Sequence, residues 1–87
     1  MKFLVSRDRP TGLEGADRVL ESEDGMLYLA RWNHNEFQGW VFYSVKFSRS
    51  TNSKSLTTIG YTGTEFLDWT DEEVVDFVNW ALGKNNG

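Results

Sequence analysis

The chain has 87 residues, a net charge of −4 and no cysteine, and its aromatic residues are six Phe, four Trp and three Tyr. The lack of cysteine excludes disulfides, thiolate metal sites and cysteine nucleophiles, and the negative charge argues against general affinity for nucleic acid. This length is typical of one domain, so we expect residues 1–87 to fold as a unit that leaves some of its many aromatic rings on the surface.

The expected cellular location follows from what the sequence lacks. No apolar stretch approaches the roughly 20 residues that span a bilayer, and the apolar run at the N-terminus is too short for a signal peptide. Small secreted domains usually carry disulfides, so a chain without cysteine favours the reducing cytosol. We therefore expect a cytoplasmic protein that does not contact membranes.

The first part of the chain predicts one strand and a long loop. Residues 3–5 are apolar and form a run of the right length for a short strand. Residues 8–25 contain Pro10 and several glycines, and this density of turn formers predicts a loop. A short helical turn over residues 16–21 has weaker support.

The middle of the chain predicts three further strands. Residues 26–32 form one, and residues 39–49 form a stronger one that is rich in the β-branched and aromatic residues of pleated surfaces. The polar connection between them predicts a hairpin. Residues 48–55 are rich in serine, which is typical of a turn, and residues 56–61 alternate weakly and predict a third hairpin strand.

A C-terminal helix has the strongest local signal. Thr70 stands three residues before Glu73, which is the spacing of a capping box, and residues 71–73 are acidic at the positive end of the helix dipole. Gly83 predicts that the helix ends after Leu82. The apolar positions fall within one arc, made of Val74, Val75, Phe77, Val78, Ala81 and Leu82. The sequence therefore predicts an α+β fold, in which a small antiparallel sheet of three or four strands packs against this helix.

No residue pattern predicts catalysis, a metal site or a bound cofactor. His34 is the only histidine, and zinc needs three or four convergent ligands, so we interpret this residue as a solvated loop histidine. No serine stands in a nucleophile elbow, and the glycines match neither a P-loop nor a dinucleotide fingerprint. Most of the carboxylates fall in predicted loops or on the exposed side of the helix, where no catalytic cleft is expected. We therefore predict that the protein is not an enzyme.

The charges divide the chain into a basic and an acidic part. Residues 26–61 hold four Lys or Arg and one Glu, whereas residues 62–82 hold six carboxylates and no Lys or Arg. An ordinary solvated helix face is the commoner origin of such a run. The alternative is an acidic recognition surface, in which Glu72, Glu73 and Asp76 contact a partner with a basic surface.

Trp80 lies outside the predicted apolar arc, beside Glu73 and Asp76. Tryptophan is enriched at the energetic hot spots of protein interfaces. This position therefore predicts an interface anchor as readily as a side chain that covers the edge of the sheet.

The strand over residues 39–49 places aromatic side chains on both of its faces. One face carries Val41, Tyr43, Val45 and Phe47, and we expect it to meet the helix. Trp40 and Phe42 then face outward, and a hairpin with its tip at residues 33–39 pairs Trp32 with Trp40 and brings Tyr28 to the same side. The result is an aromatic platform, unless the long loop covers that face as a second small core.

Two classes of function fit these observations. The leading hypothesis is a non-catalytic protein-binding module, such as a small acidic inhibitor or antagonist of the phage anti-defence, host-takeover or immunity type. The alternative is a single-stranded nucleic-acid-binding domain that stacks bases on Trp32, Trp40, Phe42 or Tyr28 and holds phosphates with Lys46 and Arg49. A homodimer with the aromatic face as its interface is a third hypothesis.

Overall fold

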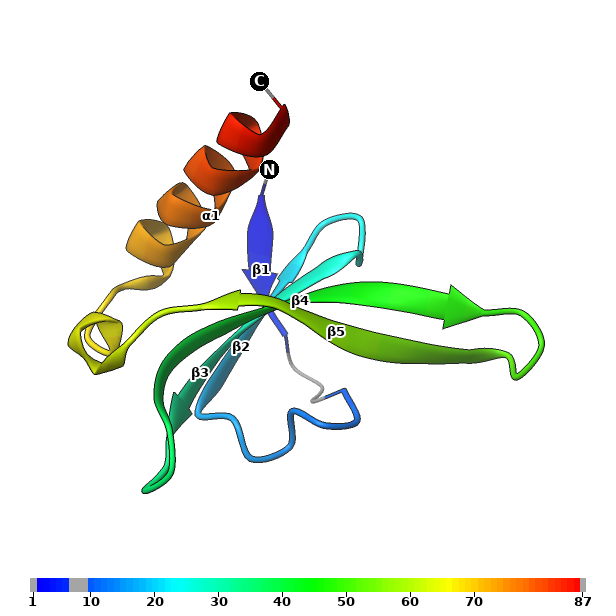
Figure 1. The fold of residues 1–87 in the computed structure, drawn as a ribbon, viewed down its shortest axis with the longest axis horizontal. Coiled ribbons are helices and arrows are strands. Elements are labelled where there is room, and N and C mark those ends of the chain that lie inside the picture. The colour runs from blue at the N-terminus through cyan, green and yellow to red at the C-terminus, as the bar shows by residue number, and fades with distance from the viewer. Residues whose placement is uncertain (1, 7–9, 87) are drawn as a thin grey trace.

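Five antiparallel strands follow one another across a single sheet in chain order, and a C-terminal helix lies on one of its faces (Figure 1). The computed structural model describes residues 2–6 and 10–86. Its elements are β1 (Phe3–Val5), β2 (Arg18–Ser22), β3 (Leu27–Asn33), β4 (Gln38–Ser48), β5 (Ser53–Tyr61), the short 3-10 helix η1 (Thr64–Phe66) and α1 (Asp71–Asn86). The α+β class is confirmed, but the sheet has five strands where the sequence predicts three or four.

The additional strand is β2, which lies inside the predicted loop and overlaps the predicted helical turn over residues 16–21. Its residues Val19 and Leu20 are both buried, one in each of the two hydrophobic clusters of the protein. A strand that is covered on both faces has no alternation of apolar and polar residues to reveal it. Asp8 and Arg9, at the start of the predicted loop, lie outside the described residues.

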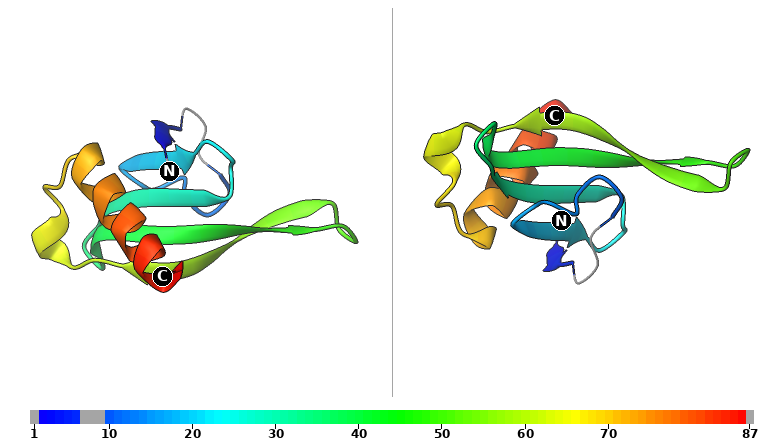
Figure 2. Two further views of the ribbon diagram at one scale, coloured as in Figure 1. Left: turned by 90° about the horizontal axis from the view of Figure 1, so that it is seen from above. Right: turned by 90° about the horizontal axis from the view of Figure 1, so that it is seen from below.

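One face of the sheet packs against α1, and we call it the helix face. Its cluster of buried side chains consists of Leu20, Leu29, Trp40, Phe42, Val74 and Val78. Val74 and Val78 belong to the predicted apolar arc, so the side of the helix that meets the sheet is confirmed. Figure 2 shows that α1 crosses the strands at the end away from the tip of the β4–β5 hairpin.

The loop between β1 and β2 covers part of the opposite face, which we call the loop face. Leu13 and Ala16 from this loop are buried against Val19 and Ala30 of the sheet. Figure 1 shows the loop and the helix on opposite sides of the strands. Two thin clusters, one on each side of the sheet, therefore replace a single core, and this arrangement buries more large side chains than one layer does.

The hairpin of β3 and β4 is shifted by one residue from the predicted pairing. Trp32 lies opposite Gly39, not opposite Trp40, because the connection is shorter than predicted and contains only residues 34–37. A shift of one residue in the pairing of two strands moves every side chain of one strand to the opposite face of the sheet relative to the side chains of the other strand. Trp32 therefore shares the loop face with Tyr43 and is on the opposite side of the sheet from Trp40.

The prediction that Trp40 and Phe42 face outward is wrong. Trp40 is 0% exposed and Phe42 is 7% exposed, and both lie beneath α1 on the helix face. The alternation along β4 correctly predicts which of its side chains share a face. Both faces are apolar, however, so the pattern does not indicate which of them packs against the helix. The loop does form a second small core, but over the face of Val41 and Tyr43.

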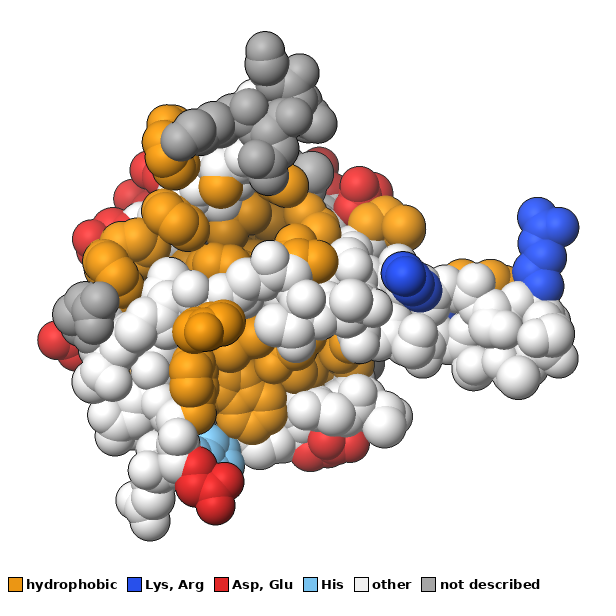
Figure 3. Space-filling model, in the orientation of Figure 1, with side chains coloured by type: hydrophobic (Ala, Val, Ile, Leu, Met, Phe, Trp, Pro, Cys, Tyr) orange, Lys and Arg blue, Asp and Glu red, His pale blue; other side chains and the backbone are white. Residues whose placement is uncertain are grey.

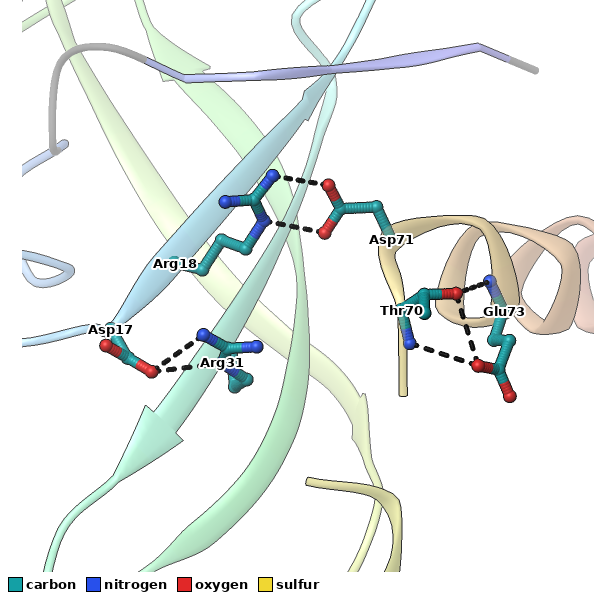
Figure 4. Close-up of polar contacts among 6 residues, drawn as sticks. All are labelled: Asp17, Arg18, Arg31, Thr70, Asp71 and Glu73. Atoms are coloured by element: carbon teal, nitrogen blue, oxygen red, sulfur yellow. Dashed lines mark hydrogen bonds and ion pairs between the residues drawn. The ribbon is translucent and has the colours of Figure 1, made fainter. Parts of the chain in front are cut away.

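The start of α1 is confirmed and its end is not. The backbone N–H of Thr70 donates to Glu73 Oε1 at 3.2 Å, and that of Glu73 donates to Thr70 Oγ1 at 3.3 Å, which completes the capping box (Figure 4). The helix continues to Asn86 rather than ending after Leu82. Gly83 keeps a helical backbone there, since it is not one of the glycines with positive φ.

The β4–β5 hairpin extends beyond the rest of the molecule (Figure 1). We call residues 46–55 the arm, and nearly all of them are exposed. The pairing of β5 with β4 is irregular between Phe42 and Tyr43, where Ile59 is the extra residue, and this position lies inside the sheet, before the arm begins. Bulges bend and twist a strand locally.

Gly39 gives a direct test of how β4 packs on the segment after β5. Its φ is +138°, and a Cβ there lies 2.5 Å from the Thr62 carbonyl oxygen. We expect Gly39→Ala to lower the free energy of unfolding by about 3 kcal/mol or more, because backbone strain and steric overlap add. Gly12→Ala is the matched control, since Gly12 has a φ of +98° but no atom within 4 Å. That variant should lose only about 1–2 kcal/mol in urea denaturation, and equal losses for the two would contradict the steric argument.

Candidate functional site

The exposed side of α1 is the first of two candidate surfaces, and we call it the acidic helix face. Glu72, Asp76 and Trp80 follow one another at intervals of four residues, so their side chains form one row along the helix, with Glu73 beside it. All four are exposed, and Trp80 is 60% exposed. The structure therefore brings these four predicted site residues together on one surface, and their role in binding remains a prediction.

The ring of Trp80 is supported from below by an aromatic row. Its centroid lies 6.1 Å from that of Phe77, which in turn lies 6.0 Å from that of the buried Phe42. Trp69 packs on the other side of Phe77, at 5.5 Å. An exposed ring that is already positioned by its neighbours loses less conformational freedom when a partner covers it.

Two ion pairs join described residues. The first lies at the edge of the acidic helix face, and the second lies away from that face. Arg18 donates from Nε to Asp71 Oδ1 at 2.6 Å and from Nη2 to Asp71 Oδ2 at 2.5 Å, which joins β2 to the first turn of α1 (Figure 4). The hydrogen bond to Asp71 raises the pKa of Arg18, so the guanidinium stays charged. Arg31 pairs with Asp17 at 2.8 Å. Neither pair neutralises the row of exposed carboxylates.

A groove of about 500 Å³ runs between β1 and the first half of α1, next to the acidic helix face. Its apolar lining consists of Phe3, Leu4, Val5, Leu20 and Val75. Its charged lining consists of Asp71, Glu72 and Asp76, with Lys2 as the one cation. An apolar floor beside carboxylates suits a long cationic side chain, because Lys and Arg bury their stems and keep their charged heads near a counter-charge.

The second candidate surface is a hollow of about 510 Å³ on the loop face, and we call it the aromatic hollow. It is lined by Trp32, Phe37, Val41, Tyr43, Thr58 and Tyr61. Figure 3 shows hydrophobic side chains gathered in a depression in the lower half of the view. Trp32 Nε1 donates to Tyr43 Oη at 3.1 Å, and the rings of Phe37 and Tyr61 meet edge to face with centroids 6.1 Å apart. Burial raises the pKa of Tyr43, so its hydroxyl stays neutral.

Most residues of the aromatic hollow are not among those that the sequence predicts for a site. Trp32 is the only one of them among the predicted site residues, and it reaches the hollow because the hairpin register differs from the prediction. The sequence places Tyr43 on the face that meets the helix, whereas it lies on the loop face. Tyr61 is the last residue of β5, and the weak alternation of apolar and polar residues in this strand does not indicate a binding surface. The remaining predicted residues, Trp40 and Phe42, are core side chains and are not available to a partner.

His34 is exposed at the hairpin tip, as predicted, but it also has a structural contact. Its Nε2 lies 2.9 Å from the carbonyl oxygen of Gly15, and its ring centroid lies 5.4 Å from that of Trp32. The side chain therefore joins the hairpin tip to the loop that covers the sheet.

Within residues 2–6 and 10–86, no group of three or more His, Asp or Glu side chains is placed to hold a metal ion. No helix of the described chain is long and apolar enough to cross a membrane. Comparison of the chain with protein-family models, curated proteins and solved structures finds no match.

We expect His34→Ala to lower the free energy of unfolding by about 1 kcal/mol, because one hydrogen bond to the loop is lost, and to leave binding of a protein partner unchanged. Asn35→Ala, at the neighbouring exposed position, is the control and should change stability by less than about 0.5 kcal/mol. Denaturant unfolding and partner binding measured on the same preparations test both statements. A protein that stays folded but loses its activity would show that the histidine is functional and that the non-enzyme prediction is wrong.

Proposed function

We propose that the protein is a non-catalytic protein-binding module of the inhibitor or antagonist type, which docks its acidic helix face on a basic surface of a partner protein. The observation that carries this proposal is the position of Trp80. A large ring that is 60% exposed stands in a row with Glu72 and Asp76 and rests on a buried aromatic cluster. Tryptophan is enriched at interface hot spots, and polar residues usually form the rim around such an anchor.

The carboxylates and the ring support different parts of the binding reaction. Exposed charges of one sign attract an oppositely charged surface and raise the association rate. A buried tryptophan slows dissociation, because its removal from water contributes apolar energy that charges at the rim do not. The row of Glu72, Asp76 and Trp80 supplies both within three turns of one rigid helix.

The groove beside β1 extends this surface and favours a particular partner side chain. Its carboxylates Asp71, Glu72 and Asp76 stand next to an apolar floor, so a Lys or Arg of the partner finds both a counter-charge and a place for its stem. Asp71 is already paired with Arg18, which leaves Glu72 and Asp76 as the principal acceptors. The proposal therefore names a basic protein surface rather than any protein surface.

The test has two steps. Affinity capture from the native host identifies the protein that is retained, and the binding of each variant to that protein is then measured. We expect the double variant Glu73→Lys and Asp76→Lys to weaken binding and still to fold. Both side chains are exposed, and loss of the Glu73 hydrogen bond to the Thr70 N–H should lower the free energy of unfolding by only about 1 kcal/mol. The loss should shrink as salt rises, since charges on the surface act over only about 10 Å at 0.1 M ionic strength. Trp80→Ala should cost about 2 kcal/mol, mainly through a faster off-rate.

The control is a second double variant, Glu23→Lys and Glu36→Lys, which makes the same change in net charge at exposed positions outside α1. It should keep most of the affinity, because the net charge is altered but the acidic helix face is not. If both double variants weaken binding equally, only net charge matters and the proposed surface is wrong. If neither has an effect and Trp80→Ala is also neutral, the partner binds elsewhere.

A further inference from the structure

The aromatic hollow presents rings to a ligand and no charges. None of the six residues that line it is an Asp, Glu, Lys, Arg or His, and four of them are aromatic. Tyr61 is 71% exposed at its edge, whereas the hydrogen bond between Trp32 and Tyr43 holds the rings of its floor in place. Rings that are fixed and accessible are suited to a flat, weakly polar group that stacks on them.

The hollow continues along the loop face toward the arm. Four cross-strand pairs of β4 and β5 follow one another on this face: Val41 with Tyr61, Tyr43 with Thr58, Val45 with Leu56 and Phe47 with Lys54. At about 6.8 Å for every two residues, the first and last pairs are roughly 20 Å apart. A second hollow of about 420 Å³ lies on the same path and includes Tyr28, Leu56 and Lys54 in its lining. The surface is therefore a strip long enough for several units of a linear ligand.

The end of this strip is positively charged. Between residues 37 and 63 the charged residues are Lys46, Arg49 and Lys54, and all three are exposed on the arm. Lys54 pairs with Phe47 on the loop face and Arg49 stands in the turn, whereas Lys46 points to the other side of the ribbon. Figure 3 shows Lys and Arg side chains on the arm and no acidic side chain on the visible part of it. The carboxylates of α1 lie on the other side of the sheet. A ligand that fits this side of the molecule combines flat rings with negative charge.

We propose that the aromatic hollow and the arm together bind single-stranded nucleic acid. Bases stack on Tyr61 and on the rings of the hollow, and the cations of the arm hold the phosphates. A duplex lacks free base faces, and a proline-rich peptide uses the rings but not the cations. This site goes beyond the proposed protein-binding function, because it lies on the opposite face of the sheet and shares no residue with the acidic helix face.

The site differs from the nucleic-acid platform that the sequence predicts. Trp40 and Phe42, the centre of that platform, are buried beneath α1 and take no part. Trp32 belongs to both versions, and Tyr61 replaces the buried rings as the accessible stacking surface. The cations of the arm are also separated from the carboxylates of α1, which would repel phosphates.

The test is fluorescence anisotropy with a fluorescein-labelled 12-nucleotide oligothymidylate and with a duplex of the same length. We expect the single strand to bind at least about tenfold more tightly than the duplex, because only the single strand offers free base faces. Affinity should fall as salt rises, and Lys54→Ala should reduce the slope of that dependence by about one released counterion.

Tyr61 provides the matched pair of variants. Tyr61→Ala should weaken oligothymidylate binding about tenfold, whereas Tyr61→Phe, which keeps the ring, should stay within about twofold of the original affinity. The side chain is largely exposed, so both variants should fold, and their denaturant unfolding curves verify this. Glu36→Lys should strengthen binding, because Glu36 lines a hollow that shares Trp32 and Phe37 with the aromatic hollow.

Several outcomes overturn this site. Equal affinity for single strand and duplex shows that charge alone attracts the oligonucleotide. An unchanged affinity for Tyr61→Ala removes the stacking argument. Binding of a ten-residue polyproline peptide that depends on Tyr61, with no binding of oligothymidylate, makes the hollow a peptide site. The helix variant Glu73→Lys with Asp76→Lys separates this inference from the proposed function, because it should weaken the protein partner but not the oligonucleotide.

Discussion

The burial of Trp40 is the constraint on which the rest of the structure depends. Its ring fills the space between the sheet and α1, and its backbone is held on both sides by Thr62, which accepts from Trp40 N–H at 3.1 Å through Oγ1 and donates its own N–H to Trp40 oxygen at 2.8 Å. The adjacent Gly39 lets the chain after β5 approach closely enough for these bonds. They fix where β5 ends and hold the segment that leads to η1 against β4.

The sheet also separates the charges of the protein. Its helix face supports α1, which carries exposed carboxylates, and its strands β4 and β5 continue into an arm that carries only cations. Arg18 and Asp71 link the helix to β2 at one point, and this link neutralises little of either surface. Negative charge is therefore concentrated on one side of the molecule and positive charge on the other, although the net charge is modest. Two partners of opposite charge are able to approach it without competing for the same surface.

Local signals in the sequence predict the helix. They do not predict which distant residues pair with one another. The capping box of Thr70 and Glu73 needs only neighbours along the chain, and the apolar arc needs only the helical period. The strand β2 has no such signal, because Val19 and Leu20 are buried on opposite faces by elements from two different parts of the chain. The assignment of Trp40 failed for a related reason, since a strand that is apolar on both faces does not record which one the helix covers.

The arm has a thermodynamic consequence that is separate from its charge. Residues 46–55 form a two-stranded ribbon whose side chains are nearly all in water, and such a ribbon is marginally stable without a layer to pack on. Its backbone hydrogen bonds therefore open in local fluctuations that leave the two hydrophobic clusters intact. A ligand that bridges the aromatic hollow and the arm must order this ribbon, and part of the binding free energy is used for that ordering. The affinity for such a ligand would therefore depend on the stiffness of β4 and β5 as well as on the strength of its contacts.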